Sequence, residues 1–206
     1  MTNVKAPYWD SVYGNKAATD VSWYEERPEK SLELIRSTAV TFDDPIVDVG
    51  GGASFLVDEL LTAGYRELTV LDISGVVLKK LAERLGTRAA SVSLVQQNVM
   101  AFQPDKPYAL WHDRAVFHFL TQKHDRLRYV EALRRTLRPT GHVVIATFGP
   151  AGPERCSGLP TLRYDTDALS AELGPDFTLI DSALVLHRTP WNTSQQFLYC
   201  RFDRTA

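Results

Sequence analysis

The stretch IVDVGGGASF, residues 46–55, decides how the rest of the chain is interpreted. A short apolar run that carries Asp48 leads into three successive glycines, Gly50, Gly51 and Gly52. Because glycine loses more backbone entropy on folding than any other residue, three in a row indicate a turn that brings the backbone close to a ligand. A buried strand followed by such a turn and a helix is typical of sites for nucleotide-type cofactors.

Strand-like and helix-like segments alternate on both sides of this turn. The alternation predicts parallel βαβ units, and therefore an α/β fold with a doubly wound, mostly parallel sheet of seven strands. The last two strands are joined by the short turn RTPWNT and are expected to form a C-terminal antiparallel β-hairpin. Ser54 is expected to cap the first helix after the turn, and Gly64 to end that helix. Gly86 is expected to end the next helix. The expected strands are residues 45–50, 67–74, 91–99, 107–116, 141–148, 177–187 and 194–203, and the expected helices are residues 54–64, 75–86 and 123–138.

The length of 206 residues is enough for one well-buried domain and too short for two ordinary ones. We therefore expect a single domain over residues 1–206, made of three parts. Residues 1–40 form an aromatic and helical N-terminal cover, residues 46–148 a cofactor-binding core, and residues 149–206 a substrate loop followed by the C-terminal hairpin.

The composition is that of an ordinary globular protein, with 44% apolar and 23% charged residues. A net charge of −2 gives no basic field that would attract nucleic acid or an anionic membrane. Two cysteines, Cys156 and Cys200, form neither a zinc pattern nor a disulfide framework. The N-terminus lacks an apolar signal core, and no run approaches the ~18 apolar residues of a membrane span. We expect a cytoplasmic protein that binds no metal, nucleic acid or membrane.

An acidic residue at the end of the next strand narrows the choice of cofactor. Asp72 lies 20 residues after Gly52, where a carboxylate can accept hydrogen bonds from ribose hydroxyls. The dinucleotide fingerprint G-x-G-x-x-G would require glycine where this chain has Phe55. A carboxylate at Asp48 would repel a pyrophosphate and attract an ammonium group. These residues indicate an adenosine-containing cofactor that carries an ammonium group instead of a pyrophosphate.

Several motifs resemble those of class I S-adenosylmethionine-dependent methyltransferases. Asp48, Gly50 and Gly52 resemble the family's first motif, D/E-x-G-x-G-x-G, with Ser54 in place of the last glycine. QQNVM, residues 96–100, resembles the third motif, and LWHDRAVFHFL, residues 110–120, resembles the fourth. LRPTGHVVI is similar to the family's LRPGG turn and the strand after it. The resemblance extends from residue 46 to residue 148, and the order and spacing of the motifs make it specific.

The resemblance implies a Rossmann-like methyltransferase fold, S-adenosyl-L-methionine as cofactor, S-adenosyl-L-homocysteine as product and no metal. Asp48 would then reach the methionine end of the cofactor, Asp72 the ribose and Asn98 the adenine amino group. The cofactor residues implied in this way are Asp48, Gly50, Gly51, Gly52, Ser54, Asp72, Ile73, Asn98, Val99 and Asp113.

An aromatic cluster precedes the first strand. Trp9 and Tyr13 lie four residues apart, on one face if this stretch is helical, and Trp23 follows them. Aromatic faces attract cations such as a sulfonium, and large rings exclude water. We predict that Trp9, Tyr13 and Trp23 act as a group that covers the cofactor.

Methyl transfer from a sulfonium needs alignment of the acceptor, exclusion of water and, for some acceptors, a base. The predicted catalytic residues lie at or just beyond the fourth strand, where the acceptor would meet the methyl group: His112, Asp113, Arg114 and His118. Either histidine can act as a base near neutral pH, and Arg114 can hold an acidic acceptor or pair with Asp113. The glycine- and proline-rich loop at residues 149–165 is predicted to contact the acceptor through Arg155, Cys156 and Arg163.

The acceptor is less clearly indicated than the cofactor. The chain has neither the N/D-P-P-Y motif of amino-group methylases after its fourth strand nor the D-K-G-T found in some protein-lysine methylases. A compact chain with an aromatic cover favours a small-molecule acceptor. Protein lysine methylation is the alternative, and a non-catalytic cofactor-binding partner or sensor is a third hypothesis.

Overall fold

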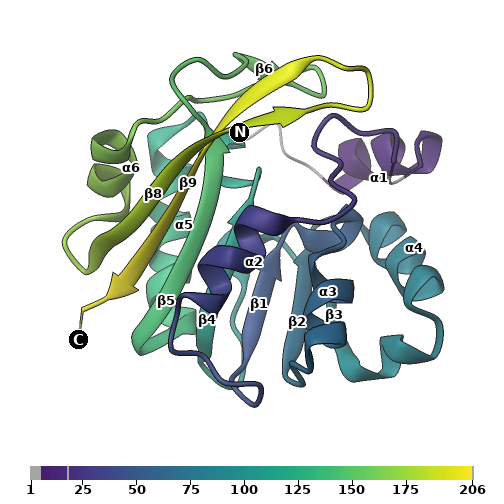
Figure 1. Cartoon of the computed structure of the whole chain (residues 1–206), viewed down its shortest axis with the longest axis horizontal. Helices are drawn as coiled ribbons and strands as arrows, with labels where there is room; N and C mark the ends of the chain where they lie inside the picture. The colour runs from purple at the N-terminus through teal and green to yellow at the C-terminus, as the bar shows by residue number, and fades with distance from the viewer. Residues whose placement is uncertain (1–5, 18, 206) are drawn as a thin grey trace.

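The computed structural model describes residues 6–17 and 19–205. Within these residues, seven strands form one sheet in the order β3-β2-β1-β4-β5-β9-β8 (Figure 1). The first five are parallel, whereas β9 runs antiparallel to both of its neighbours. This confirms the predicted mostly parallel sheet with a C-terminal hairpin. The strands are β1 (Ile46–Val49), β2 (Leu68–Asp72), β3 (Val92–Gln96), β4 (Tyr108–Arg114), β5 (Leu137–Phe148), β8 (Phe177–Arg188) and β9 (Ser194–Arg204).

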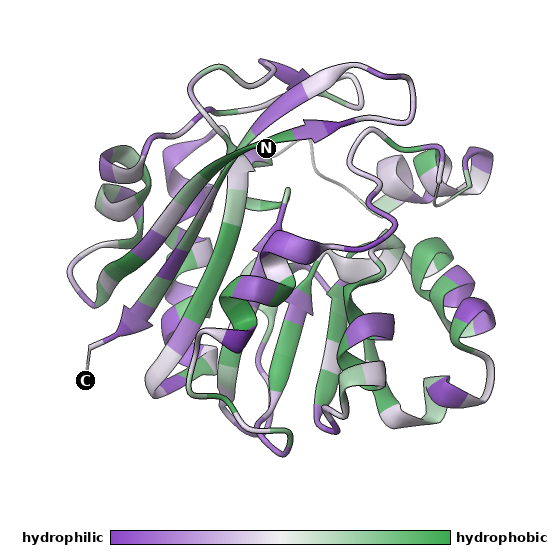
Figure 2. Ribbon diagram, viewed as in Figure 1, coloured by the Kyte–Doolittle hydropathy of each residue, from purple (hydrophilic) through white to green (hydrophobic). Residues whose placement is uncertain are grey.

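Helices cover both faces of the sheet and bury an apolar core on each. One face packs against α2 (Glu29–Arg36), α3 (Leu56–Ala63) and α4 (Gly75–Leu85), and the other against α5 (Lys123–Thr136) and α6 (Thr166–Leu173). Figure 2 shows the apolar residues concentrated in the central strands. Such two-sided burial explains why β1 and β2 are buried at every position, as parallel strands between two helical layers are.

The N-terminal helix α1 (Ala6–Asn15) belongs to neither layer. It lies beyond the carboxyl ends of the strands and contacts α4 (Figure 1). Residues 1–5 and 18, which are part of the predicted cover at residues 1–40, lie outside the described residues.

Several element boundaries differ from expectation. Phe55, not Ser54, occupies the N-cap position of α3, and the Ser54 hydroxyl accepts a hydrogen bond from the Leu56 amide at 3.0 Å. Gly64 and Gly86 end α3 and α4 as predicted. The fifth helix ends at Thr136, two residues earlier than expected, because the chain enters β5 directly.

The loop at residues 149–165 has structure of its own. It contains a short antiparallel pair, β6 (Arg155–Cys156) and β7 (Leu159–Pro160), and it leads into α6, which was not expected. The Asp165 side chain caps α6 by accepting a hydrogen bond from the Ala168 amide at 2.8 Å. Asp165, an aspartate in the N-cap position of the helix, was therefore the sequence signal for α6.

The turn after β1 requires its glycines. Gly50 adopts a left-handed conformation with φ +69°, and a Cβ there would lie 2.2 Å from a methyl group of Val116. A Cβ at Gly51 would lie 2.1 Å from the Asp48 Oδ2 atom. The backbone therefore passes closer to its neighbours than any side chain would allow.

We expect Gly50→Ala to lower the free energy of unfolding more than Gly64→Ala. Both glycines are left-handed, but a Cβ at Gly64 would meet nothing within 4 Å. Gly64→Ala is the control and should lower the free energy of unfolding by about 1–2 kcal/mol because of its left-handed backbone. Gly50→Ala should lower it by a further ~1–3 kcal/mol because of the collision. Urea denaturation of both variants measures the difference, and equal losses would contradict this account of the turn.

Candidate functional site

A pocket opens at the carboxyl ends of β1, β2 and β4, beneath α1. This edge of an open parallel sheet is where ligands bind in such folds. Most of the residues predicted for the cofactor or for its cover line this pocket. They are Trp9, Tyr13, Trp23, Gly50, Asp72, Ile73, Asn98 and Val99.

Asp72 ends β2 at the wall of this pocket. Its Oδ2 atom accepts a hydrogen bond from the Gly52 amide at 3.2 Å, and its Oδ1 atom accepts one from the Ser74 amide at 2.9 Å. Burial, with a smaller contribution from the charge of Asp48, raises the pKa of the Asp72 carboxyl to about 6. Gly52 thus supports Asp72 and does not itself line the pocket.

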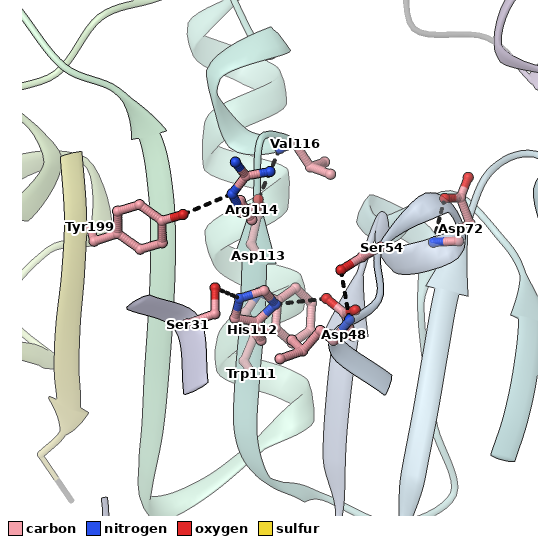
Figure 3. A network of polar contacts seen from close by, with 12 residues as sticks. Ser31, Asp48, Ser54, Asp72, Trp111, His112, Asp113, Arg114, Val116 and Tyr199 are labelled. Atoms are coloured by element: carbon pink, nitrogen blue, oxygen red, sulfur yellow. Dashed lines mark hydrogen bonds and ion pairs between the residues drawn. The ribbon is translucent and has the colours of Figure 1, made fainter. Parts of the chain in front are cut away.

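A second, smaller pocket lies beside the glycine turn and shares Trp23, Gly50 and Arg114 with the first. Asp48 lines it and is 3% exposed. The Asp48 Oδ1 atom lies 2.7 Å from the Nδ1 atom of His112, as Figure 3 shows. The Asp48 Oδ2 atom is buried and has no hydrogen-bond partner. Gly51 and Ser54 line the same small pocket.

Aromatic rings close the pocket from above. Trp9 and Tyr13 are buried on one face of α1, and their rings are stacked with centroids 5.8 Å apart. Trp9 also meets Trp23 and Phe119 edge-on, at 5.9 and 5.3 Å. Burial raises the pKa of the Tyr13 hydroxyl, so this ring stays neutral. The predicted aromatic group is thus assembled over the pocket.

Hydrogen bonds from three polar side chains fasten α1. Asp10 accepts hydrogen bonds from the Ser74 hydroxyl at 2.6 Å and from the Val76 amide at 3.3 Å. Lys80 donates to the Tyr13 carbonyl, and Tyr8 donates to the Ser157 carbonyl. In sequence, these polar residues follow the ordinary pattern of a solvent-facing helix surface, so they carried no signal of this role.

Arg114 connects the segment after α1 to the sheet. Its guanidinium donates to the Trp23 carbonyl at 2.7 Å and to the Tyr199 hydroxyl at 2.8 Å, and it pairs with Glu25 at 2.9 Å. Of the two pairings considered for Arg114, the one with Asp113 is therefore wrong. No local sequence signal marks Glu25 or Tyr199, because both come from distant parts of the chain.

Asp113 is not brought to either pocket. Its carboxylate accepts hydrogen bonds from the Val116 amide at 2.9 Å and from the Tyr129 hydroxyl at 2.5 Å, on the α5 side of the sheet. Successive side chains of a strand point to opposite faces, so His112 and Arg114 face the pockets while Asp113 faces away. This corrects the expectation that Asp113 contacts the cofactor.

His118 is fully buried, with its ring against those of Phe119 and Phe148. Its Nδ1 atom accepts a hydrogen bond from the Phe148 amide at 3.2 Å. Burial, together with the nearby charge of Arg114, lowers the pKa of His118 to about 3. A histidine with this pKa is a weak base at neutral pH, and the arrangement gives no support to the predicted role.

The three residues predicted to contact the acceptor do not line the pockets. Arg155 donates to the Gly158 carbonyl, and Arg163 pairs with Glu154 at 3.0 Å. Cys156 is buried, with its Sγ atom 3.8 Å from the Ser22 hydroxyl. The loop that carries these residues contacts the cover instead.

Residues 6–17 and 19–205 contain no group of three or more His, Cys, Asp or Glu side chains placed to hold a metal ion. Across this same part of the chain, no helix combines the length and apolar character needed to cross a membrane.

Comparison with known proteins gives one family match. Residues 46–141 match a family model described as a methyltransferase domain. The chain is also similar to the eEF1A lysine and N-terminal methyltransferase of Mus musculus, with 27% identity over 142 residues. The match covers 68% of this chain and 20% of the mouse protein, so the chain spans about a fifth of the length of that relative.

Solved structures share the fold. The 1,6-didemethyltoxoflavin-N1-methyltransferase of Burkholderia thailandensis, crystallised with 1,6-didemethyltoxoflavin and S-adenosylhomocysteine, aligns with a TM-score of 0.68 and 22% identity. That alignment covers 97% of this chain and 84% of the other. The [4+2]-cyclase SpnF aligns with a TM-score of 0.71 and 14% identity, over 97% and 93% of the two chains. At these identities the alignments establish the fold and leave the reaction to the site itself.

Replacing Asp113 with Asn should change how stability depends on pH. Because burial raises the pKa of Asp113 to about 6 in the folded protein, its stabilising contribution is full below about pH 4 and is lost as the pH rises through 6. We expect the wild-type free energy of unfolding to fall relative to Asp113→Asn by up to about 3 kcal/mol between pH 4 and 7. Urea denaturation at several pH values tests this, and a constant difference would show that Asp113 does not titrate there.

Proposed function

We propose that this chain, which carries a class I S-adenosylmethionine-dependent methyltransferase domain, transfers the methyl group of that cofactor to a small-molecule acceptor. The observation that carries the proposal is the pocket at the carboxyl edge of the sheet. Asp72 and Asn98 line this pocket, and the aromatic rings of Trp9, Tyr13 and Trp23 close it.

The residues present fit the cofactor. The Asp48 Oδ2 atom is buried without a partner, and a buried charge without a partner costs free energy. An ammonium group at the amino-acid end of the cofactor would supply that partner. Asp72 would hold the ribose, and Asn98 and Val99, which line the same pocket, would contact the adenine.

The protein's own part in the reaction is alignment and exclusion of water. When bound, the cofactor supplies a methyl group on a sulfonium, which is already a good electrophile. Aromatic faces at Trp9 and Trp23 stabilise a nearby cation, and a closed cover keeps water away from it. Both ring nitrogens of His112 are engaged by other side chains, and the pKa of His118 is about 3, so neither is arranged to remove a proton.

The closure of the cover favours a small acceptor. Trp9 and Tyr13 are each only 7% exposed, and contacts from α4 and from the loop at residues 149–165 hold α1 in place. A small molecule can be enclosed beneath such a cover, whereas the lysine of a folded protein needs an open channel. The Burkholderia enzyme of the same fold was crystallised with a small molecule.

Protein lysine methylation is the second candidate function. The sequence similarity to the mouse lysine and N-terminal methyltransferase favours it. The third hypothesis is a non-catalytic cofactor-binding partner or sensor. The intact glycine turn and Asp72 argue against lost cofactor binding but not against lost catalysis. The division into cover, core and substrate loop with hairpin likewise stays a proposal.

Calorimetry should detect binding of S-adenosylhomocysteine and none of NAD. Asp72→Ala should weaken the binding by about 1–3 kcal/mol, the value of a hydrogen bond to a charged group. Because ribose hydroxyls donate to the ionised carboxylate, and the pKa of Asp72 is about 6, wild-type affinity should rise by up to about tenfold between pH 5 and 7. Asp72→Asn should remove this rise and Asp113→Asn should keep it. A rise that persists in Asp72→Asn would exclude Asp72 as the ribose partner.

Labelled methyl transfer into a cell lysate separates the candidate functions. We expect label from the cofactor to appear in the small-molecule fraction. Label confined to the protein fraction would favour lysine methylation. No label in either fraction, together with tight binding of S-adenosylhomocysteine, would favour the non-catalytic hypothesis. The Asp48→Asn variant, assayed in parallel, controls for transfer by other proteins in the lysate.

A further inference from the structure

A chain of buried polar contacts runs from Arg114 to Asp48 across four elements of the fold, and Figure 3 shows its hydrogen bonds from Arg114 to Tyr199 and from Ser31 through His112 to Asp48. The Arg114 Nε atom donates to the Tyr199 hydroxyl at 2.8 Å, and the Tyr199 hydroxyl lies near the Ser31 side chain. The Ser31 Oγ atom lies 2.9 Å from His112 Nε2, and His112 Nδ1 lies 2.7 Å from the Asp48 Oδ1 atom. The chain thus links β4, β9, α2 and β1.

This chain of polar contacts is almost entirely shielded from water. Ser31, Asp48, His112 and Tyr199 are each no more than 3% exposed. Buried polar groups in such a place must find partners within the protein, because an unmade hydrogen bond there costs about 1–3 kcal/mol. Apolar side chains would fill the same space without that requirement, so the presence of four polar groups needs a reason.

The charged partners determine the direction of the hydrogen bonds at the two ends of the chain. A guanidinium can only donate and a carboxylate can only accept, so His112 Nδ1 carries a hydrogen that it donates to Asp48. The Ser31 hydroxyl, which can donate or accept, is the partner of the other ring nitrogen, Nε2. Arg114 therefore donates at one end of the chain, and His112 donates to Asp48 at the other.

The last hydrogen bond uses one oxygen of Asp48 and leaves the other free. Oδ1 is held by His112, whereas Oδ2 is buried, has no partner and lies against Gly51, where no side chain is present. A carboxylate held at one oxygen cannot rotate to satisfy the other. It therefore presents one unpartnered oxygen in a fixed place at the wall of the small pocket.

We propose that His112 is a positioning residue, which holds Asp48 with Ser31 and Tyr199 so that the Oδ2 atom is presented to the ammonium group of the cofactor. The proposal rests on the proposed cofactor binding. It replaces the expectation that His112 is a base, because both of its ring nitrogens are already occupied.

Arg114, the first residue of this chain of polar contacts, has a second role. Arg114 also holds the Trp23 carbonyl and pairs with Glu25, both in the segment that follows α1. The same guanidinium therefore fastens the cover and begins the chain that ends at Asp48. Recognition of the ammonium group and closure of the cover share this one side chain.

The test compares two ligands that differ in the ammonium group alone: S-adenosylhomocysteine and its deaminated analogue. The measured quantity is the dissociation constant of the analogue divided by that of S-adenosylhomocysteine. Both constants are obtained by calorimetry on the full chain. Asp48→Asn sets the ratio that remains without the carboxylate. We expect His112→Leu to lower the wild-type ratio by about tenfold, as for a lost hydrogen bond to a charged group.

Two further variants separate positioning from general structural support. His112→Asn retains a donor near the Nδ1 position and should keep the ratio within about threefold of wild type. Tyr129→Phe breaks the matched buried chain from Trp111 to Asp113 on the opposite face of β4, where the bonds measure 2.9 and 2.5 Å. It should lower the free energy of unfolding and leave the ratio unchanged. Ser31→Ala, which removes the partner of Nε2, provides an intermediate loss if His112→Leu does not fold.

Each outcome is decisive for one of the two proposals. A wild-type protein that binds neither ligand would overturn the proposed cofactor binding itself. If the wild type binds S-adenosylhomocysteine more tightly than the analogue, and His112→Leu or Ser31→Ala preserves that preference, the positioning role is wrong. An equal fall of the ratio in Tyr129→Phe would likewise overturn it, because the effect would then follow any break in a buried polar chain.

Discussion

The carboxyl edge of the sheet depends on one buried carboxylate. Asp48 lies at the third position of β1 and its Oδ2 atom lies so close to Gly51 that any side chain there would collide with it. The glycine turn is therefore needed by the acid as well as by a ligand. On the other side, His112 and Ser31 satisfy the Oδ1 atom, which ties α2 and β4 to the same point. Because a buried charge is costly without partners, the neighbours of Asp48 are constrained in both conformation and chemistry.

Side chains of strand β4 point alternately to the two faces of the sheet, so its residues take part in two different sets of contacts. His112 and Arg114 face the pockets and bind Asp48, the cover and β9. Trp111 and Asp113 face α5, where Tyr129 links them within a hydrophobic core. Four residues that are consecutive in sequence thus belong to two separate hydrogen-bond networks. One network serves the pocket, and the other holds the turn that follows the strand through the Val116 amide.

The site suits a reaction that needs enclosure more than proton transfer. Aromatic rings line the pocket, both histidines considered as bases are engaged or buried, and the cover is fastened at α4, at Arg114 and at the loop of residues 149–165. These features agree with the proposed methyl transfer to a small acceptor.

The sheet, its hairpin, the glycine turn and the acids Asp48 and Asp72 in the first two strands were predictable from the sequence, because periodicity, turn residues and motif spacing are local properties of a chain. The face of β4 that each polar residue occupies, and the partners that it meets, became known from the folded structure. Asp113 was expected at the pocket and faces away from it, and Arg114 pairs with Glu25, which lies far from it in sequence. Ser31, Glu25 and Tyr199 carried no signal, since a residue's role in a buried network depends on groups that folding alone brings within hydrogen-bond distance.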